Sequence, residues 1–181
     1  MIHIVLYRPE KPSNTGNIMR TCVAADVTLD IIGPITFSLD DKDLKRAGLD
    51  YIESLKMNVF SSYEEFCKRY PNQEIYYVTR YSNKVYTSFD LSNKVDDLFI
   101  MFGRESTGIP HEILGEHPDH LLRIPMVINA RSLNLSNCVA IVLYEALRQQ
   151  DFLSLATHET LKGEDFLAKD LRRHQLWKKV C

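Results

Sequence analysis

Short apolar runs alternate along the chain with segments whose apolar positions recur at helical spacing. The runs rich in β-branched and aromatic residues cover positions 2–7, 29–32, 75–79, 98–102 and 121–124. Helical spacing predicts helices over positions 15–25, 41–47, 63–69, 110–116 and 134–150. Strands that alternate with helices indicate an α/β fold with a largely parallel sheet flanked by helices. In such folds, ligands bind at the edge where the carboxyl ends of the strands meet.

The predicted helix over 134–150 has a polar start and an apolar body. Its core-facing stripe follows the spacing i, i+3, i+4, i+7 and comprises Leu135, Cys138, Val139, Val142, Leu143, Ala146 and Leu147. Ile141 and Tyr144 widen the apolar arc, which indicates cover by the chain's own domain and by a second subunit. At the start, Ser132 and Asn134 offer hydrogen bonds to a ligand beside unpaired backbone N–H groups. N-capping of the helix alone explains the same residues.

Composition narrows the domain count and the classes of site. A chain of 181 residues, 45% of them hydrophobic, can bury one substantial core. We expect one domain over 1–157 and a tail over 158–181. The formal net charge of −2 argues against bulk attraction to nucleic acid, so RNA binding would rest on local basic patches. The four cysteines lie far apart and form no C-x-x-C pair, so we expect neither a metal site nor a disulfide framework.

The chain lacks several signals for targeting and for common enzymes. Its start has neither the basic region nor the cleavage site of a secretory signal, and no apolar run approaches the roughly 20 residues that span a bilayer. We therefore expect a cytoplasmic protein without membrane contact. The chain also has no G-x-G-x-x-G loop, no Walker A lysine loop, no H-E-x-x-H pair and no G-x-S-x-G elbow. The absence of these motifs argues against the common nucleotide-binding and hydrolase functions.

After Gln150 the apolar pattern weakens, and apolar and basic positions then alternate. The apolar ones are Leu161, Phe166, Leu167, Leu171 and Trp177. The basic ones are Lys162, Lys169, Arg172, Arg173, Lys178 and Lys179. This pattern predicts a basic amphipathic helix at the C-terminus. It either docks on the body with its charged face in solvent or contacts RNA.

The first of three polar segments that suit chemistry heads the predicted helix over 15–25. It reads SNTGNIMRT over positions 13–21. Helical geometry places Asn14, Asn17, Arg20 and Thr21 on one face. The planar fork of donors on arginine suits a phosphate or a sugar. An ordinary amphipathic helix fits these residues equally well.

The other two segments follow predicted strands. Residues 102–110 (FGRESTGIP) leave a strand with two glycines, which permit a close backbone approach, and place Glu105 at the strand's mouth. A tight turn explains the glycines as well. The third segment joins the I-P-M sequence at 124–126 to RSLNLSN at 131–137, and its exposed backbone suits the edge of an adenine. None of the three is specific by itself.

Together and in this order, however, the three segments resemble the motifs of the SpoU branch of the SPOUT RNA 2′-O-methyltransferases. Those motifs are N-x-G-N-x-x-R-T, then F-G-x-E-x-x-G-I/L-P, then I-P-M followed by S-L-N-L-S-N-x-x-A. The match covers nearly all of positions 1–150. The opening over 4–18 and the block over 41–51 resemble more specifically the minimal subfamily that methylates the wobble nucleotide of leucine tRNAs. Minimal members generally end soon after the equivalent of Gln150, so the tail departs from the pattern.

The resemblance implies an α/β sheet with a deep trefoil knot near its C-terminus, S-adenosylmethionine bound there, and a homodimer whose active site draws on both subunits. Knots are nearly absent from proteins, so periodicity alone does not predict one. The cofactor would contact Val78, Thr79, Gly103, Ile124, Met126, Ser132 and Leu133, largely through backbone groups. The family's catalytic positions match Asn14, Arg20, Glu105, Ser132 and Asn134. The resemblance also implies RNA contacts by Asn17, Arg20, Lys42, Lys45 and Arg46.

The expected activity is therefore transfer of a methyl group from S-adenosylmethionine to the 2′-oxygen of a tRNA wobble cytidine or uridine derivative. The product of the cofactor is S-adenosylhomocysteine, and no metal is implied because the donor methyl is already on a sulfonium. One alternative is the same chemistry on another tRNA or rRNA nucleotide. Others are a knotted RNA-binding protein without catalysis and an α/β protein that binds a small molecule and no RNA.

Overall fold

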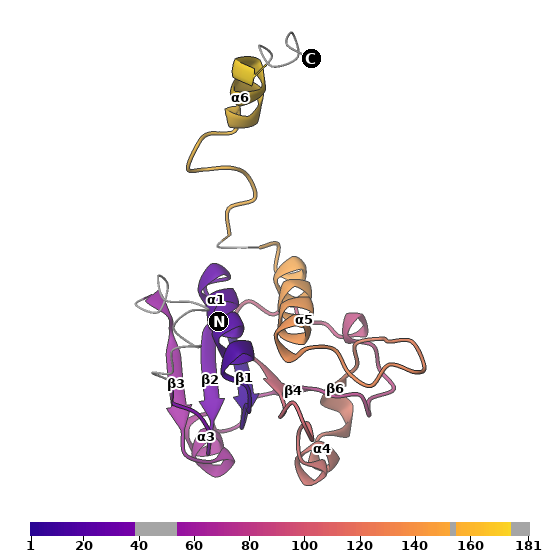
Figure 1. The fold of residues 1–181 in the computed structure, drawn as a ribbon. Helices are drawn as coiled ribbons and strands as arrows, with labels where there is room; N and C mark the ends of the chain where they lie inside the picture. Colours follow the sequence, from indigo (N-terminus) through magenta and orange to yellow (C-terminus); the bar gives the residue numbers. More distant parts are fainter. Residues whose placement is uncertain (39–53, 153–154, 175–181) are drawn as a thin grey trace. The chain divides into compact units, whose positions relative to one another are not determined.

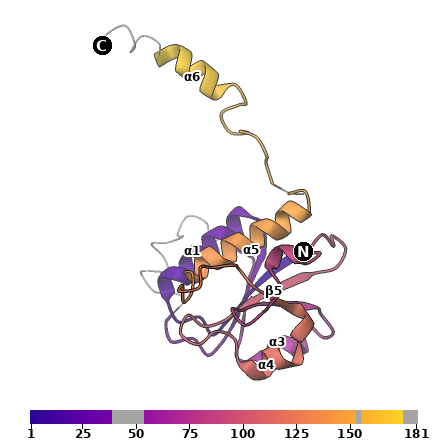
Figure 2. The same ribbon diagram turned by 90° about the vertical axis from the view of Figure 1, so that its right-hand side faces the viewer.

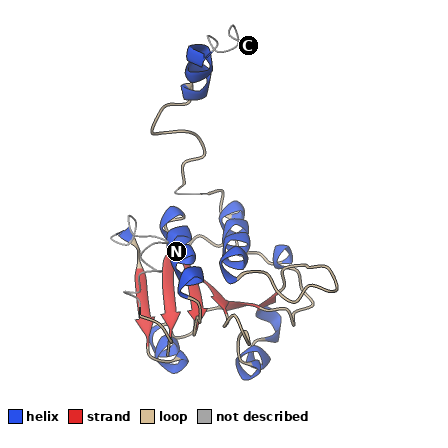
Figure 3. Ribbon diagram, viewed as in Figure 1, coloured by secondary structure: helices blue, strands red, loops and turns tan. Residues whose placement is uncertain are grey.

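Six parallel strands form the sheet in the computed structural model (Figure 1, Figure 3). The structure describes residues 1–38, 54–152 and 155–174. The strands are β1 (Ile2–Tyr7), β2 (Thr28–Ile32), β3 (Met57–Phe60), β4 (Ile75–Val78), β5 (Leu98–Phe102) and β6 (Leu121–Leu122). Their order across the sheet is β3-β2-β1-β5-β4-β6, and every neighbouring pair is parallel. The predicted α/β class with a parallel sheet is confirmed.

The apolar runs locate five of these strands. The predictions for 2–7 and 98–102 match the observed bounds, whereas β6 ends at Leu122, two residues before the predicted end. The sequence pattern missed β3 because it lies at the edge of the sheet. There Asn58 and Val59 are exposed and only Phe60 is buried, so the strand carries little apolar signal.

The helices of the sheet domain are α1 (Pro12–Ala24), α3 (Tyr63–Arg69), α4 (His111–Glu116) and α5 (Leu135–Gln149), with short 3-10 turns η2 (Tyr86–Ser88) and η3 (Pro118–His120). The predicted bounds of α3 are confirmed, and the Ser62 hydroxyl accepts from the Glu65 backbone N–H as its N-cap. Helix α1 begins three residues before its predicted start, with Pro12 at the first position, where its missing N–H costs nothing. The helix predicted over 41–47 lies outside the described residues.

Helices cover both faces of the sheet, with α1 and α5 on one side and α3 and α4 on the other (Figure 2). Alternate residues of each strand point to opposite faces. On the α3 and α4 side, a cluster of buried aromatic and aliphatic residues includes Val5, Phe66, Tyr77, Phe99 and Met101. Central strands buried on both faces are typical of parallel sheets. The helix α5 stripe predicted from the sequence is buried over most of its length.

A buried polar pair interrupts this apolar core. His3 Nδ1 lies 2.7 Å from Asp30 Oδ2, and the Asp30 side chain is fully buried. The Asn58 amide donates to the other carboxylate oxygen at 2.8 Å. The His3 ring stacks on Phe99 with ring centroids 4.3 Å apart. These contacts join β1, β2 and β3 through side chains as well as through the backbone ladder.

All parallel strands end at one edge of the sheet, and the loops that leave this edge carry the predicted site. β1 ends at Tyr7, β4 at Val78 and β5 at Phe102. These three strands lie side by side in the sheet, in the order β1-β5-β4. Just after β4, the Thr79 backbone N–H donates a hydrogen bond to the Leu122 carbonyl of β6 at 2.9 Å. The sheet therefore brings the loops after β1, β4 and β5 together.

Residues 152–181 form a second unit, in which the structure places helix α6 (Phe166–His174). Leu167 and Leu171 lie one turn apart on this helix and are exposed, and Lys169 pairs with Asp165 at 2.7 Å. Within the region where the sequence predicts a C-terminal helix, the structure thus has a helix over 166–174. Among the described residues, no helix is long and apolar enough to cross a bilayer. The knot stays a prediction.

The buried pair yields the first test. Asp30→Ala leaves the His3 ring and the Asn58 amide without their buried acceptor, so the free energy of unfolding should fall by about 3 kcal/mol. The control is Lys56→Ala, which removes an exposed ion pair with Asp26 and should cost at most about 1 kcal/mol. Urea unfolding measures both. Equal losses for the two variants would contradict the structural role of Asp30.

Candidate active site

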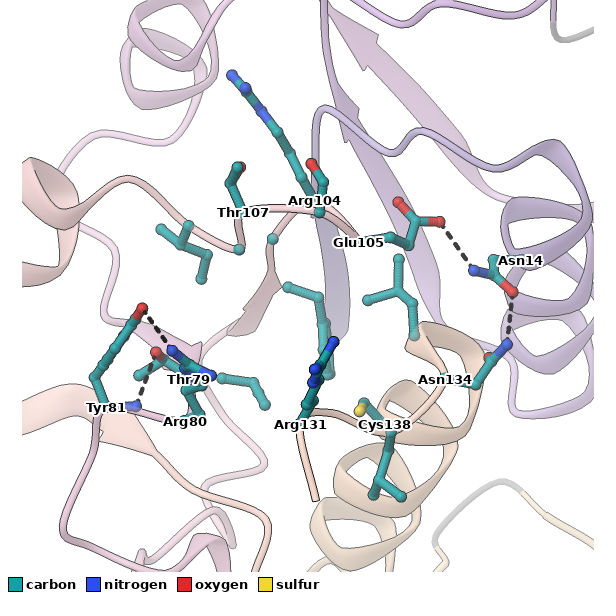
Figure 4. Close-up of a pocket in the computed structure, with 18 of the residues that line it drawn as sticks. Asn14, Thr79, Arg80, Tyr81, Arg104, Glu105, Thr107, Arg131, Asn134 and Cys138 are labelled. Carbon is teal, nitrogen blue, oxygen red and sulfur yellow. Dashed lines mark hydrogen bonds between the residues drawn. The ribbon is translucent and has the colours of Figure 1, made fainter. Parts of the chain in front are cut away.

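A cavity of about 890 Å³ opens where the loops after β4 and β5 meet the starts of α1 and α5 (Figure 4). The loop after β4 supplies residues 78–81 and the loop after β5 supplies residues 102–111. Asn14 comes from α1, and residues 131 and 133–135 lead into α5. The cavity thus lies at the carboxyl edge of the sheet and takes side chains from each of the three polar segments.

A chain of hydrogen bonds joins the three segments at the wall of this cavity (Figure 4). The Asn134 amide donates to Asn14 Oδ1 at 2.9 Å, and the Asn14 amide donates to Glu105 Oε1 at 2.9 Å. Asn134 Oδ1 in turn accepts from the Ser136 backbone N–H at 2.8 Å, which makes Asn134 the N-cap of α5. The predicted capping therefore occurs, and the same side chain also takes part in the site.

Two carboxylates hold the loop after β1 against the loop after β5. Glu105 accepts from the backbone N–H groups of Glu10 and Lys11 at 2.9 and 3.2 Å. In return, Glu10 accepts from the Ser106 backbone N–H at 2.9 Å and from the Ser106 hydroxyl at 2.7 Å. These hydrogen bonds lower the pKa of Glu10 from its ordinary value of 4.5. We call this reciprocal arrangement the carboxylate clamp.

The loop after β5 turns back tightly on itself. The backbone N–H and carbonyl groups of Arg104 and Gly108 pair with each other at 3.0 and 3.2 Å. A Cβ atom on Gly103 would lie 2.1 Å from the Gly108 carbonyl carbon, so only glycine fits there. Gly108 has a φ of +75°, which also favours glycine. Gly103 thus makes the predicted close backbone approach, whereas Gly108 serves the tight turn that also explains the glycines.

Positive charge surrounds the cavity. Lys11, Arg80, Arg104 and Arg131 all line it. Glu105 is the single carboxylate among the lining residues, and the clamp and Asn14 occupy its oxygens. A concave site with this balance attracts anionic ligands such as phosphates.

The structure gathers about half of the predicted site residues at the cavity. The predicted residues that line it are Asn14, Val78, Thr79, Gly103, Glu105, Leu133 and Asn134. Ile124, Met126 and Ser132 lie on the neighbouring segment without lining it. Lys42, Lys45 and Arg46 lie outside the described residues. Their role in RNA binding stays a prediction.

The predicted site residues on helix α1 do not share one face in the structure. Asn14 is 5% exposed and points into the cavity wall, whereas Asn17 and Arg20 are exposed farther along the helix and do not line the cavity. Asn14 thus lies on the buried side of α1 with Ile18 and Cys22, which are fully buried. The prediction that Asn14 shares the exposed face with Asn17 and Arg20 is wrong. The structure therefore does not bring Asn17 and Arg20 to this chain's own cavity, and their roles stay a prediction.

Sequence reasoning missed several residues around the cavity. These are Glu10, Arg80, Tyr81, Arg104, His111 and Arg131. Each of Glu10, Arg80 and Arg104 lies within three residues of the end of a strand, and that position is the signal that could have found them. Within the described part of the chain, no three His, Cys, Asp or Glu side chains group as metal ligands do.

The family model for the SpoU rRNA Methylase family matches residues 1–144, which is most of the chain. The chain belongs to this family. A Geobacillus stearothermophilus protein is 50% identical over 155 residues, which are 86% of this chain and 99% of that protein. The tRNA (cytidine(34)-2′-O)-methyltransferase of Escherichia coli is 42% identical over 150 residues, 82% of this chain and 94% of that enzyme. The three motifs quoted above lie within the matched range.

Solved structures of SpoU-type enzymes share the fold. A structure described as giving insights into the 2-OH methylation of C/U34 on tRNA aligns with a TM-score of 0.77 and 36% identity, over 83% of this chain and 97% of the other. The methyltransferase AviRb of Streptomyces viridochromogenes, in complex with AdoMet, aligns with a TM-score of 0.69 and 25% identity. That alignment covers 82% of this chain and 60% of AviRb.

The carboxylate clamp generates a prediction about pH. The pKa of Glu10 is lower in the folded state than its ordinary 4.5, so its stabilisation is complete above that pH and is lost as the pH falls through the lowered pKa. In Glu10→Gln an amide NH₂ replaces one acceptor oxygen and faces a Ser106 donor. The difference in melting temperature between wild type and variant should be largest near neutral pH and shrink in acid.

The companion variant is Ser106→Ala, which removes the hydroxyl donor and leaves the backbone N–H in place. It should show a smaller loss of melting temperature with the same dependence on pH. A difference between wild type and Glu10→Gln that grows as the pH falls would be incompatible with the clamp.

Proposed function

We propose that this SpoU-family protein transfers a methyl group from S-adenosylmethionine to the ribose 2′-oxygen of the wobble nucleotide, position 34, of a tRNA. The observation that carries the proposal is the chain Glu105–Asn14–Asn134, which joins all three family motifs at the wall of one cavity. The matched enzymes with this named activity support the choice of nucleotide. With tRNA as substrate, we place the activity in the cytoplasm.

The cavity suits S-adenosylmethionine by its size and by its lining. About 890 Å³ falls within the usual range for a small-molecule site, roughly 300–1,000 Å³. Val78, Thr79, Gly103 and Leu133 line it, and the close packing of Gly103 against Gly108 exposes backbone groups rather than side chains. We assign these residues to the cofactor, with Ile124, Met126 and Ser132 on the adjoining segment. When bound, the cofactor supplies a methyl group already activated on a sulfonium.

The residues of this chain then have mainly to align the reacting groups. The chain Glu105–Asn14–Asn134 and the carboxylate clamp fix the loops that form the cavity wall, and a fixed wall is what the alignment of an acceptor oxygen with a methyl donor would require. Glu105 acts here as a positioning residue, because its oxygens are occupied by protein donors. Arg80, Arg104 and Arg131 provide charge for the RNA phosphates.

We assign the substrate-facing role on the RNA side to Arg20. The guanidinium of arginine stays protonated in proteins, so Arg20 orients a phosphate and stabilises negative charge on the 2′-oxygen, and the hydroxyl proton passes to solvent water. Because Arg20 lies on the exposed side of α1 and outside its own cavity, we propose a homodimer in which each Arg20 serves the other subunit's site. Tyr144, 46% exposed on α5, belongs to the apolar surface that such a dimer would cover.

We keep the division into a methyltransferase domain over 1–157 and a helical extension over 158–181. The extension adds Lys169, Arg172 and Arg173 on α6, which we assign to RNA contacts beyond the anticodon together with Asn17 and the block of Lys42, Lys45 and Arg46. Basic residues of this kind contribute affinity through phosphates without reading sequence.

Methyl transfer from radiolabelled S-adenosylmethionine to total tRNA tests the proposal directly. Digestion of the product should yield a 2′-O-methylated nucleoside that maps to the wobble position of a tRNA. Label on a different nucleotide would move the site of action, and binding of the cofactor without any transfer would favour a non-catalytic RNA-binding protein. Inactivated enzyme and S-adenosylhomocysteine as product inhibitor are the controls.

The role of Arg20 has its own test. Arg20→Ala should lower the rate of methyl transfer by about 100-fold or more, as removal of a charge-stabilising donor does, while calorimetry shows the affinity for S-adenosylmethionine close to wild type. Arg20→Lys keeps the charge and loses the planar fork, so it should recover only part of the rate. Parallel loss of rate and of cofactor affinity would refute the assignment to RNA.

Mixed dimers distinguish an active site shared between two subunits from an active site contained within one subunit. Arg20→Ala and Asn134→Ala subunits, each inactive alone, should regain activity when mixed, because one site of the heterodimer then combines an intact cavity with an intact Arg20. If Arg20 served its own subunit, every site in the mixture would carry one defect and no activity would return.

A further inference from the structure

Tyr81 presents an exposed aromatic ring at the cavity. It lines the cavity and is 52% exposed, so its ring is accessible to a ligand. In Figure 4 it lies across the cavity from the chain Glu105–Asn14–Asn134. No role in the methyl transfer described above uses this ring.

Neighbouring groups hold the ring in place. The Tyr81 backbone N–H donates to the Thr79 hydroxyl at 3.2 Å, which fixes the loop just after β4. The His111 ring, at the start of α4, meets the Tyr81 ring edge to face with centroids 4.9 Å apart. The Arg80 guanidinium carbon lies 5.0 Å from the centroid of the Tyr81 ring, and one of its nitrogens donates to the Tyr81 hydroxyl at 3.4 Å. An ordered ring loses little entropy when a ligand stacks on it.

An aromatic ring beside a cation has the chemistry that recognises a nucleotide. The ring takes the base by stacking, and the cation takes the adjoining phosphate. Arg104 and Arg131 line the same cavity and add to this charge. The ring is half exposed, so a ligand that extends beyond the cavity, as an RNA strand does, can reach it.

We propose that Tyr81, flanked by Arg80 and His111, is a stacking platform for an unpaired base of the anticodon loop next to the methylated nucleotide. This inference rests on the proposed function, which requires a single-stranded RNA segment at the cavity. Stacking tolerates any base, so the platform holds the loop in register without reading its sequence. The platform would thereby place the target ribose against the cofactor's methyl group.

The experiment measures binding of a fluorescently labelled anticodon stem-loop RNA to the full-length protein. Tyr81→Ala should weaken binding by about 10- to 100-fold, the range for loss of one base–aromatic stack. Tyr81→Phe keeps the ring and is the matched control, with binding close to wild type. Calorimetry should show the affinity for S-adenosylmethionine unchanged in both variants, and sedimentation should show an unchanged oligomeric state.

Abasic RNAs identify the stacked base. A series of stem-loops, each lacking one base next to the wobble position, should contain one RNA that binds wild type weakly and is no longer sensitive to Tyr81→Ala. Such coupling is the signature of a direct contact. Uniform sensitivity across the series, weaker binding of the cofactor, or a changed oligomeric state in Tyr81→Ala would each overturn the proposal.

The failure of this inference and the failure of the proposed function give different results. If wild type methylates the wobble nucleotide but no abasic RNA couples to Tyr81, only the platform is wrong. If wild type binds the stem-loop with coupling but methylates a different nucleotide, only the assigned position is wrong. If wild type binds no stem-loop RNA, both are wrong.

Discussion

The buried carboxamide of Asn14 is the contact on which the rest of the site depends. A carboxamide both donates and accepts, so Asn14 can accept from Asn134 while it donates to Glu105. Asn14 is 5% exposed, so its own carboxamide depends on these two partners, and a residue without both functions would lose at least one of the two hydrogen bonds. Through this one side chain, the start of α1, the loop after β5 and the N-cap of α5 are held in a single arrangement. The three family motifs are therefore three parts of one hydrogen-bonded unit.

The carboxylate clamp gives the same loops a second connection. Glu10 and Glu105 each accept from the other's loop, so the crossing is held by four hydrogen bonds in addition to the Asn14 contact. Hydrogen bonds to charged carboxylates are stronger than neutral ones, and here they occupy the only carboxylate that lines the cavity. The remaining charge around the cavity is positive. The same contacts that make the wall rigid thus leave a site suited to a nucleic-acid backbone, although the whole chain carries a formal net charge of −2.

The family match and the cavity involve the same part of the chain, because every residue that lines the cavity lies within the matched range. The match to the SpoU rRNA Methylase family covers residues 1–144 and comes from sequence alone. The cavity and its hydrogen bonds come from the positions of atoms. Arg20, by contrast, is exposed on α1 and does not line this cavity. That separation is the observation from which the shared site is proposed.

By itself, the sequence determined the α/β class, five of the six strands and most of the helix bounds, because burial on both faces of a parallel sheet leaves strong local patterns in the chain. It also identified Asn14, Glu105 and Asn134 through their motifs. Only the tertiary structure decided that these three side chains bond to one another across 91 and 120 residues of separation, that Glu10 completes the clamp, and that Tyr81 stands at the cavity. The exposed edge strand β3 likewise left no apolar pattern. Contacts between distant loops depend on strand order, and no local periodicity records that order.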